Sequence, residues 1–292
     1  MKSGWSKLFG TLGITGRESA AQMTKLLYSA QIAQLQEHCR NLLGTPRMAD
    51  PGRLLTSGYR VYSQSDEDGI IHEIFRRIGE GARTFVELGS GDGVENNSHF
   101  LLLQGWRGLW IEGSARRAAA ARKSLAAPIR EGRLRIEQQF VTAANADELI
   151  QRHAPARDID LLAIDLDGND YYVLEAIRSV NPRAIVAEYN AKFPPAVAWV
   201  MEYNEAHQWD GTDYFGASLK ALEVLLSKRG YSLVGCNLLG TNAFFVRQDL
   251  VADPPFCSPF TSENHYEPAR YFLLPAFYSG FPPGIGPHRI IG

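Results

Sequence analysis

The chain has 292 residues, of which 45% are apolar, and a net charge of −2 from 30 basic and 32 acidic residues. This length exceeds the usual ~100–200 residues of a single domain, and the apolar content is sufficient for a sizeable core. We therefore expect one main domain with additions. A nearly neutral chain without a block of like charge has no electrostatic basis for binding RNA or DNA, so nucleic acid is not an expected partner.

The N-terminal region predicts a helical extension. It lacks the continuous apolar stretch of a signal peptide, and the chain has no apolar run of about 18 residues, so we expect a cytoplasmic protein without membrane insertion. The three cysteines, odd in number and without a C-x-x-C pair, agree with a reducing compartment. Apolar residues recur at helical spacing over 17–43, which predicts an amphipathic helix within an extension of residues 1–58.

A glycine-rich turn follows the apolar run T-F-V-E-L, with Gly89, Gly91 and Gly93 at alternate positions. Glycine lets the backbone approach a ligand with no Cβ in the way, and the next helix can direct its N–H groups at an anionic group. A dinucleotide-binding loop has the spacing G-x-G-x-x-G, whereas the sixth position here is Val94. With Glu87 before the turn, the pattern E-x-G-x-G-x-G resembles the first motif of S-adenosylmethionine-dependent methyltransferases. A glycine turn in another α/β protein is the alternative.

Glu112 ends the next apolar run, G-L-W-I-E. An acid about 20 residues beyond a glycine loop lies at the tip of the neighbouring strand, where it can accept hydrogen bonds from both ribose hydroxyls of a nucleoside. NAD and S-adenosylmethionine both contain this ribose. Glu112 therefore predicts a nucleoside ligand, and the glycine spacing selects S-adenosylmethionine.

Strand and helix patterns alternate from Phe85 onward, which predicts a parallel α/β sheet. The predicted parallel strands are 85–88, 108–112, 134–141, 161–164 and 184–188, and the predicted helices lie near 114–126, 145–153, 171–180 and 217–229. The runs 231–236 and 242–247 are joined by a link too short for a parallel crossover, so they should form a hairpin. These elements predict a Rossmann-like methyltransferase fold over 59–250, a mostly parallel seven-stranded sheet that ends in an antiparallel hairpin.

Two segments lie outside this scheme. Residues 191–215 are rich in aromatic side chains and follow the fifth strand, at whose carboxyl end a ligand is expected, so they predict a substrate wall or lid. An aromatic mini-core that covers the sheet edge is an equal alternative. The tail 251–292 contains 8 of the 15 prolines and should extend over the surface.

Acids also end the fourth and fifth strands. Asp165 and Asp167 are separated by one residue, so in an extended stretch they would face the same crevice. One of them could act as a general base, or both could bind a cation. Glu188 and Asn190 follow the neighbouring strand and, with Asp165, predict a divalent-metal site. His207 in the aromatic segment is an alternative base.

One further segment resembles a specific family. The sequence Y-S-Q-S-D-E-D-G-I-I of residues 62–71 is similar to the S-Q-x-x-E-D-x-I signature of FkbM-type methyltransferases, and D-L-D-G-N-D of 165–170 resembles their acidic fourth motif. The resemblance covers residues 60–250 approximately. It implies an O-methyltransferase for a sugar or another polar small molecule, with Gln64 and Asp68 near the cofactor. By composition alone, this segment is a helix start with acids in its first turn.

The acids after the fourth and fifth strands are also similar to those of magnesium-dependent catechol and macrolide-sugar O-methyltransferases, which implies Mg²⁺ as an optional aid. The predicted cofactor-binding set is Gln64, Asp68, Glu87, Gly89, Gly91, Gly93, Glu112 and Thr142, the last of which follows the third strand. The predicted catalytic residues are Asp165, Asp167 and His207, and the predicted metal ligands are Asp165, Glu188 and Asn190.

The sequence therefore predicts an S-adenosylmethionine-dependent O-methyltransferase with a sugar-like acceptor. The alternative is a non-catalytic nucleoside-binding or assembly protein of a glycan or natural-product pathway that retains this fold. Acids concentrated at the strand ends favour the enzyme, because a binding module has no need for costly buried carboxylates beside a cationic cofactor. The sequence does not determine the oligomeric state, and a homo-oligomer is one of the alternatives.

Overall fold

The computed structural model describes residues 16–251, 256–274, 281, 284 and 286–291. The chain divides into two compact units, Met1–Ala49 and Asp50–Gly292. The domain boundaries predicted at 58 and 250 stay predictions. Among the residues described, no helix combines the length and apolarity needed to cross a membrane.

The first unit contains the helix α2 (Gly16–Leu43) and a short 3-10 helix (Pro46–Ala49). The helix predicted over 17–43 is therefore confirmed. Residues 1–15, also assigned to the extension, lie outside the described residues.

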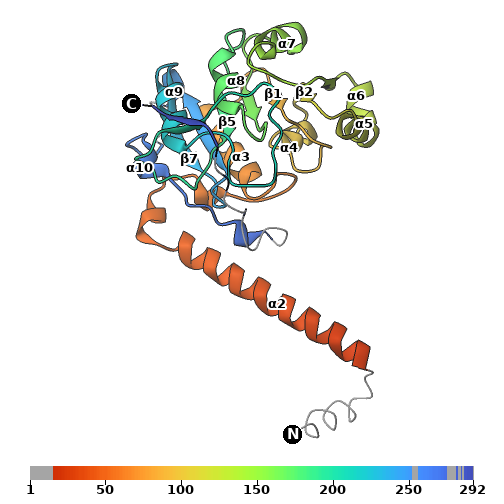
Figure 1. The fold of residues 1–292 in the computed structure, drawn as a ribbon, viewed down its shortest axis with the longest axis vertical. Coiled ribbons are helices and arrows are strands. Elements are labelled where there is room, and N and C mark those ends of the chain that lie inside the picture. The colour runs from red at the N-terminus through yellow and green to blue at the C-terminus, as the bar shows by residue number, and fades with distance from the viewer. Residues whose placement is uncertain (1–15, 252–255, 275–280, 282–283, 285, 292) are drawn as a thin grey trace, which may run out of the picture. The chain divides into compact units, whose positions relative to one another are not determined.

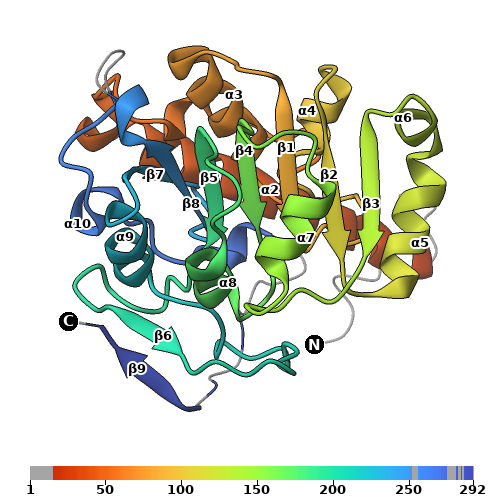
Figure 2. The same ribbon diagram turned by 90° about the horizontal axis from the view of Figure 1, so that it is seen from above.

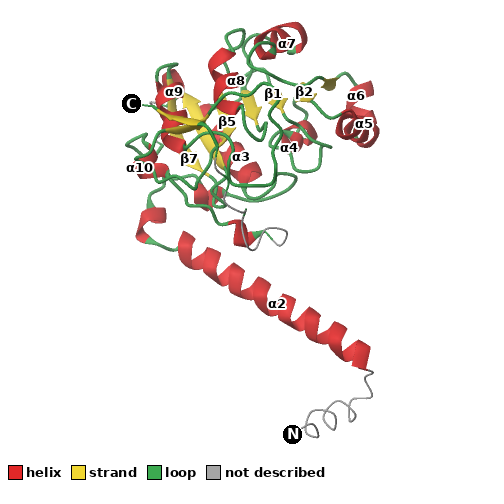
Figure 3. Cartoon of the chain, in the orientation of Figure 1, coloured by secondary structure: helices red, strands yellow, loops and turns green. Residues whose placement is uncertain are grey.

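The second unit is built on one seven-stranded sheet in the order β3-β2-β1-β4-β5-β8-β7. Its first five strands are parallel, while β8 is antiparallel to both β5 and β7. Figure 3 shows the strands and helices of this unit. The strand order and the antiparallel hairpin confirm the predicted Rossmann-like methyltransferase fold. The strands are β1 (Thr84–Leu88), β2 (Arg107–Glu112), β3 (Leu134–Gln138), β4 (Leu161–Ile164), β5 (Ala184–Glu188), β7 (Tyr231–Cys236) and β8 (Asn242–Arg247).

Helices cover both faces of this sheet. In Figure 2, α7, α8 and α9 lie in front of the strands and α3 and α4 behind them. The front layer encloses the main apolar core, in which Val173 and Leu222 pack with Val86 and Ile164 of the sheet. The helices are α3 (Glu67–Ile78), α4 (His99–Leu103), α5 (Ala115–Ser124), α6 (Ala126–Arg130), α7 (Ala146–His153), α8 (Asp170–Ala176), α9 (Leu219–Ser227) and α10 (Ser262–His265).

Two predicted elements were too long, and side-chain hydrogen bonds explain both. The third strand ends at Gln138 instead of 141, because the Asn145 amide donates to the Phe140 carbonyl and accepts from the Thr142 N–H, which removes both groups from the sheet. The helix α8 ends at Ala176 instead of 180. There Asp147 Oδ1 accepts from the backbone N–H groups that follow Ile177, so these no longer join the helix.

A second, two-stranded sheet joins the aromatic insertion to the tail. In it, β6 (Trp199–Met201) pairs antiparallel with β9 (His288–Ile290). Figure 1 shows the tail, in blue, beside the strands and helices that precede it in this unit. The tail was expected to be extended. Its described part also contains α10 and a 3-10 helix (Tyr271–Leu273), while residues 252–255, 275–280, 282–283, 285 and 292 lie outside the described residues.

Candidate functional site

The three glycines after β1 adopt backbone conformations that favour glycine. Gly89, Gly91 and Gly93 have φ values of +84°, +59° and +86°. A Cβ on Gly89 would lie 1.7 Å from the carbonyl oxygen of Asp165, so no side chain fits there. A Cβ on Gly91 would meet nothing within 4 Å. The loop is thus packed tightly against β4 at its start and open at its centre, where a ligand could approach the backbone.

Glu87 is buried below this loop and holds it in place. Its carboxylate accepts hydrogen bonds from the backbone N–H groups of Asn97 and Ser98, at 2.9 and 3.2 Å, and from the Ser98 hydroxyl. Burial raises the pKa of Glu87, and these hydrogen bonds oppose the increase. Glu87 was predicted to bind the cofactor, and its hydrogen bonds give it a positioning role for the loop between β1 and α4.

Glu112 connects the tip of β2 to the glycine loop. One carboxylate oxygen accepts from the Gly91 N–H at 2.7 Å, and the other accepts from the Ser114 N–H at 2.6 Å, at the start of α5. A carboxylate has about four acceptor positions, so capacity remains for two hydroxyl groups. The acid predicted to bind ribose therefore lies directly beside the open centre of the loop.

The segment of residues 61–68 also contacts the glycine loop. Asp68 Oδ2 accepts from the three consecutive N–H groups of residues 61–63, at 2.6 to 2.9 Å. The Tyr62 ring then stacks on His99 with a centroid distance of 3.9 Å, and His99 Nδ1 lies 2.7 Å from the Gly93 carbonyl oxygen. Gln64 is half-buried in the same segment. Asp68 thus shapes this segment, which reaches the glycine loop through Tyr62 and His99.

Thr142, also predicted to bind the cofactor, lies in the turn that precedes α7. Its N–H donates to Asn145 Oδ1 at 2.8 Å, and its carbonyl accepts from the Ala146 N–H at 3.0 Å. These bonds fix the turn between β3 and α7. Its role toward the cofactor stays a prediction.

Three carboxylates meet at the ends of β4 and β5. One oxygen from each of Asp165, Asp167 and Glu188 lies within 4.8 Å of the others. Their approach does not come from an extended strand, as the sequence suggested, because β4 ends at Ile164 and Asp167 has a φ of +55°. The turn is instead held by Asp170, whose carboxylate accepts from the N–H groups of residues 166 and 168 at 2.8 and 3.0 Å.

The pKa values of this carboxylate cluster are raised. Burial raises the pKa of Asp165 well above its usual range, and the charges of Asp167 and Asp170 add to the effect. Burial, followed by the charge of Asp165, also raises the pKa of Glu188 well above its usual range. The side chain of Asp167 is exposed, so the loss of hydration that raises its pKa is a weaker effect there, and the charge of Arg117 opposes it. The cluster therefore favours a proton, a cation or a hydrogen-bond donor among its oxygens.

Asn190 was predicted as a metal ligand, but its side chain has other partners. Its amide donates to the carbonyl oxygens of Asp213 and Phe215 at 2.8 and 3.0 Å, and its oxygen accepts from the Lys192 N–H at 3.1 Å. The strand β5 ends at Glu188, so Asn190 no longer points with it toward the cluster. Asn190 therefore anchors the aromatic insertion instead of joining the carboxylate cluster.

The aromatic insertion contacts the carboxylate turn through His207. The His207 Nε2 atom lies 3.2 Å from the Asp167 carbonyl oxygen, and the imidazole covers Gly168, where a Cβ would lie 2.3 Å from the ring. Asn169 and Asn204 form a second link at 2.8 Å. His207 is therefore close to the cluster, although its described contact is to backbone and not to a carboxylate.

Aromatic rings from the insertion and the tail form one group beside these acids. Phe281 lies 5.0 Å from Trp209, 4.7 Å from Tyr271 and 6.3 Å from Phe215, measured between ring centroids. Burial raises the pKa of Tyr271, and the charges of Glu188 and Asp213 add to this increase. Tyr271 is thus near enough to Glu188 to sense its charge, so the tail contributes to the acceptor side.

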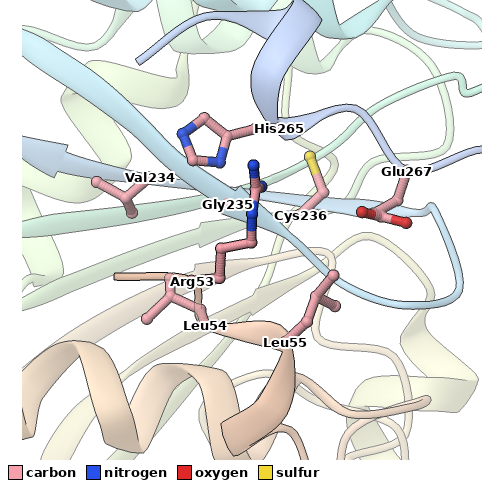
Figure 4. A pocket seen from close by; sticks show the side chains of 8 residues that line it. All are labelled: Arg53, Leu54, Leu55, Val234, Gly235, Cys236, His265 and Glu267. Atoms are coloured by element: carbon pink, nitrogen blue, oxygen red, sulfur yellow. The ribbon is translucent and has the colours of Figure 1, made fainter. Parts of the chain in front are cut away.

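Two hollows occur elsewhere. One of about 10 Å³ is lined by residues of β7 and the tail, among them Cys236, His265 and Glu267 (Figure 4), and holds one water at most. The other, of about 380 Å³, lies between α3 and α4 and is lined by Phe75, Trp106 and charged side chains. Neither includes the glycine loop or the carboxylate cluster.

No protein-family model matches the chain, and no curated protein matches it. Among solved structures, it is similar to an O-methyltransferase from Bacillus cereus with SAH, at 16% identity over 56% of this chain and 67% of that one, with a TM-score of 0.33. It is also similar to the glycopeptide N-methyltransferase MtfA with SAH, at 16% identity over 70% of this chain and 98% of that one, with a TM-score of 0.38. A third similar structure is the magnesium protoporphyrin IX methyltransferase from Synechocystis PCC 6803 with bound SAM, at 12% identity over 62% of this chain and 77% of that one, with a TM-score of 0.39. Likeness at this level does not assign an activity, which depends on the residues of the site.

Proposed function

We propose that this chain is an S-adenosylmethionine-dependent O-methyltransferase of the FkbM-like kind, acting on a sugar or another polar small molecule. The observation that supports it is the meeting of an open glycine loop, a ribose-type acid and a carboxylate cluster at one edge of the sheet, where the strands β1, β2, β4 and β5 all end. In parallel sheets the carboxyl ends of the strands are where ligands bind.

The residues present fit the cofactor. The open space at Gly91 admits a ligand against the backbone, and Glu112 beside it has free acceptor capacity for ribose hydroxyls. When bound, S-adenosylmethionine supplies an electrophilic methyl group.

The same cluster fits the acceptor chemistry. A hydroxyl attacks a methyl group poorly until its proton is removed, and a carboxylate with a raised pKa is a better base near neutral pH than an ordinary one. Asp165 and Asp167 meet this requirement. Asp165, Asp167 and Glu188 also offer oxygen ligands of the kind that Mg²⁺ binds, and Mg²⁺ would orient the hydroxyl and lower its pKa.

Calorimetry with the purified chain tests the cofactor assignment. S-adenosylmethionine and S-adenosylhomocysteine should bind with affinities at least about 100-fold higher than that of NAD, a difference of about 2.7 kcal/mol. Micromolar binding of NAD without binding of S-adenosylmethionine would contradict the proposal. Tight binding of S-adenosylmethionine together with no methyl transfer to any polyhydroxylated acceptor would instead support the non-catalytic alternative.

A further inference from the structure

A buried acid of the 62–71 segment reaches the acceptor side of the site through an asparagine. Glu67 is fully buried, and its Oε1 accepts from the side-chain amides of Asn237 and Asn242, at 2.7 and 3.1 Å. Its Oε2 accepts from the Ser65 N–H at 2.8 Å. Glu67 is thus a buried carboxylate with three donors, of which Asn237 lies in the turn after β7 and Asn242 begins β8.

This arrangement fixes the orientation of the Asn242 amide. The Asn242 side chain directs its N–H₂ group toward Glu67, whose carboxylate oxygen accepts from it. Its Oδ1 atom must then point away from Glu67. Asn237 cannot replace this contact, because its own oxygen already accepts from the N–H groups of Thr241 and Asn242.

The Asn242 side chain lies beside that of Glu188. The two residues are register partners on the antiparallel strands β8 and β5, so their side chains lie side by side on one face of the sheet. Asn242 is 5% exposed, and its Oδ1 has no hydrogen-bond partner among the described residues. Within the same described ranges, Glu188 Oε2 is also buried without a partner.

We propose that Glu67 is a positioning residue that turns Asn242 Oδ1 toward Glu188, and that this pair of acceptors recognises a primary amino group on the methyl acceptor. When Glu188 is ionised, these two oxygens lack a donor, which costs free energy, and a ligand group that satisfies both must carry at least two hydrogens. Without such a ligand, a proton on Glu188 can take its place. A hydroxyl has one hydrogen, whereas a primary ammonium has three and a charge that complements the cluster.

The proposal rests on the proposed function, and it narrows the acceptor class. The acceptor would be an amino-substituted polar molecule, such as an amino sugar, in which the amino group is bound by the Glu188 and Asn242 oxygens. The hydroxyl to be methylated would then lie toward Asp165 and Asp167, the other members of the cluster.

Glucosamine and glucose are matched probes, because they differ only at C2, where glucosamine has an amino group and glucose has a hydroxyl group. With the protein saturated by S-adenosylhomocysteine at pH 7, calorimetry should show glucosamine binding at least about tenfold more tightly than glucose. Glu67→Gln would let Asn242 turn its N–H₂ group toward Glu188, so this preference should fall to below about threefold. Asn242→Ala removes one of the two oxygens and should reduce the preference in the same way. This second variant tests the proposal even if Glu67→Gln does not fold.

Asp66→Asn is the matched control. Asp66 is the neighbouring acid, and it accepts from the Leu238 N–H of the same turn without contacting Asn242. Its variant should retain the preference for glucosamine. Equal affinities of the wild type for both sugars, absence of binding of both, or a preference that survives Glu67→Gln and Asn242→Ala would overturn the proposal. Failure of S-adenosylhomocysteine to bind would instead count against the proposed function, and the same sugar titrations without it would still test the amino-group site.

Discussion

The cofactor half and the acceptor half of this site treat their carboxylates differently. In the cofactor half, Glu87, Asp68 and Glu112 each accept at least two hydrogen bonds from backbone N–H groups. In the acceptor half, three acids lie close together, and burial, followed by the charges of its neighbours, raises the pKa of Asp165. Backbone N–H groups therefore hold each acid of the first half, although Asp68 Oδ1 has no partner among the described residues, whereas the crowded acids of the second half need a ligand, a cation or a proton among them.

Gly89→Ala should have the largest effect, because Gly89 lies where the two halves touch. Its new Cβ would be 1.7 Å from the Asp165 carbonyl oxygen, so the glycine loop and the acidic turn cannot both keep their positions. We expect S-adenosylmethionine affinity to fall by more than about 100-fold and the melting temperature to fall by several degrees. Calorimetry and thermal unfolding measure the two effects.

Gly105→Ala is the control for backbone strain alone. Gly105 also has a positive φ, +87°, but a Cβ there would meet nothing within 4 Å. It should cost about 1–2 kcal/mol of stability without a change in cofactor affinity. If both variants bound the cofactor equally well, the two halves would not be coupled through Gly89.

Asp165→Asn should impair the acceptor half and leave the cofactor half intact. The side chain keeps its size and loses its charge, so turnover should fall about 10²- to 10⁴-fold while S-adenosylmethionine affinity changes by less than about threefold. Methyl transfer with a radiolabelled cofactor gives turnover, and calorimetry gives the affinity. Glu188→Gln should behave in the same way.

Removal of divalent cations by a chelator tests whether the acceptor half uses a metal ion or a metal-free base. If a divalent cation is needed, excess chelator should reduce wild-type turnover as strongly as Asp165→Asn does. Full activity in chelator would exclude the metal version and leave a carboxylate base at Asp165 or Asp167, or His207. A carboxylate with an unperturbed pKa titrates near 4 and an imidazole near 6.5, but burial raises the pKa of Asp165 toward that of an imidazole. The base is therefore identified by the variant in which the acidic limb of the pH–rate profile disappears, and not by the position of the limb.

Glu112→Ala should have a moderate effect confined to the cofactor half. The change removes a charged acceptor for two ribose hydroxyls, each bond contributing about 1.5–3 kcal/mol before relaxation, so affinity should fall at least about tenfold. It also frees the Gly91 and Ser114 N–H groups, to which water can bind. Unchanged affinity in a folded variant would place the ribose elsewhere.

The smallest expected effect concerns pH and stability. Burial raises the pKa of Asp66 to about 7 from its usual 3.8, so its protonated form is favoured in the folded state. Its contribution is fully present below about pH 4 and is lost as pH rises toward 7. The melting temperature should therefore fall by a few degrees between pH 5 and pH 8, and Asp66→Asn should reduce that fall. An identical pH profile in the variant would show that Asp66 is ionised throughout.

Much of the cofactor half could be predicted because its signals are local in sequence. The apolar run, the alternating glycines and an acid one strand later determine β1, the loop and Glu112 within about 30 residues. The hairpin of β7 and β8 was also predictable, because its link is short. Local spacing and backbone geometry are enough for these features.

The acceptor half was less predictable because its contacts join distant segments. Asn190 seemed free to bind a metal, but its amide is used by carbonyl groups more than 20 residues later. Asn242 carried no sequence signal, since its role depends on pairing with Glu188 and on Glu67, 175 residues earlier. The role of His99 likewise depends on Tyr62, whose ring stacks on it from another segment. Such roles depend on tertiary structure, which single-residue patterns do not contain.

The pairing of β6 with β9 has a consequence for folding. Val200 pairs with Arg289, about 90 residues later, whereas the neighbours β1 and β2 are about 23 residues apart. Contacts between distant segments cost more loop-closure entropy and form late. We therefore expect the glycine loop and Glu112 to be ordered before the insertion is fixed by the end of the chain. Hydrogen exchange during refolding would then protect β1 and β2 early and β6 last.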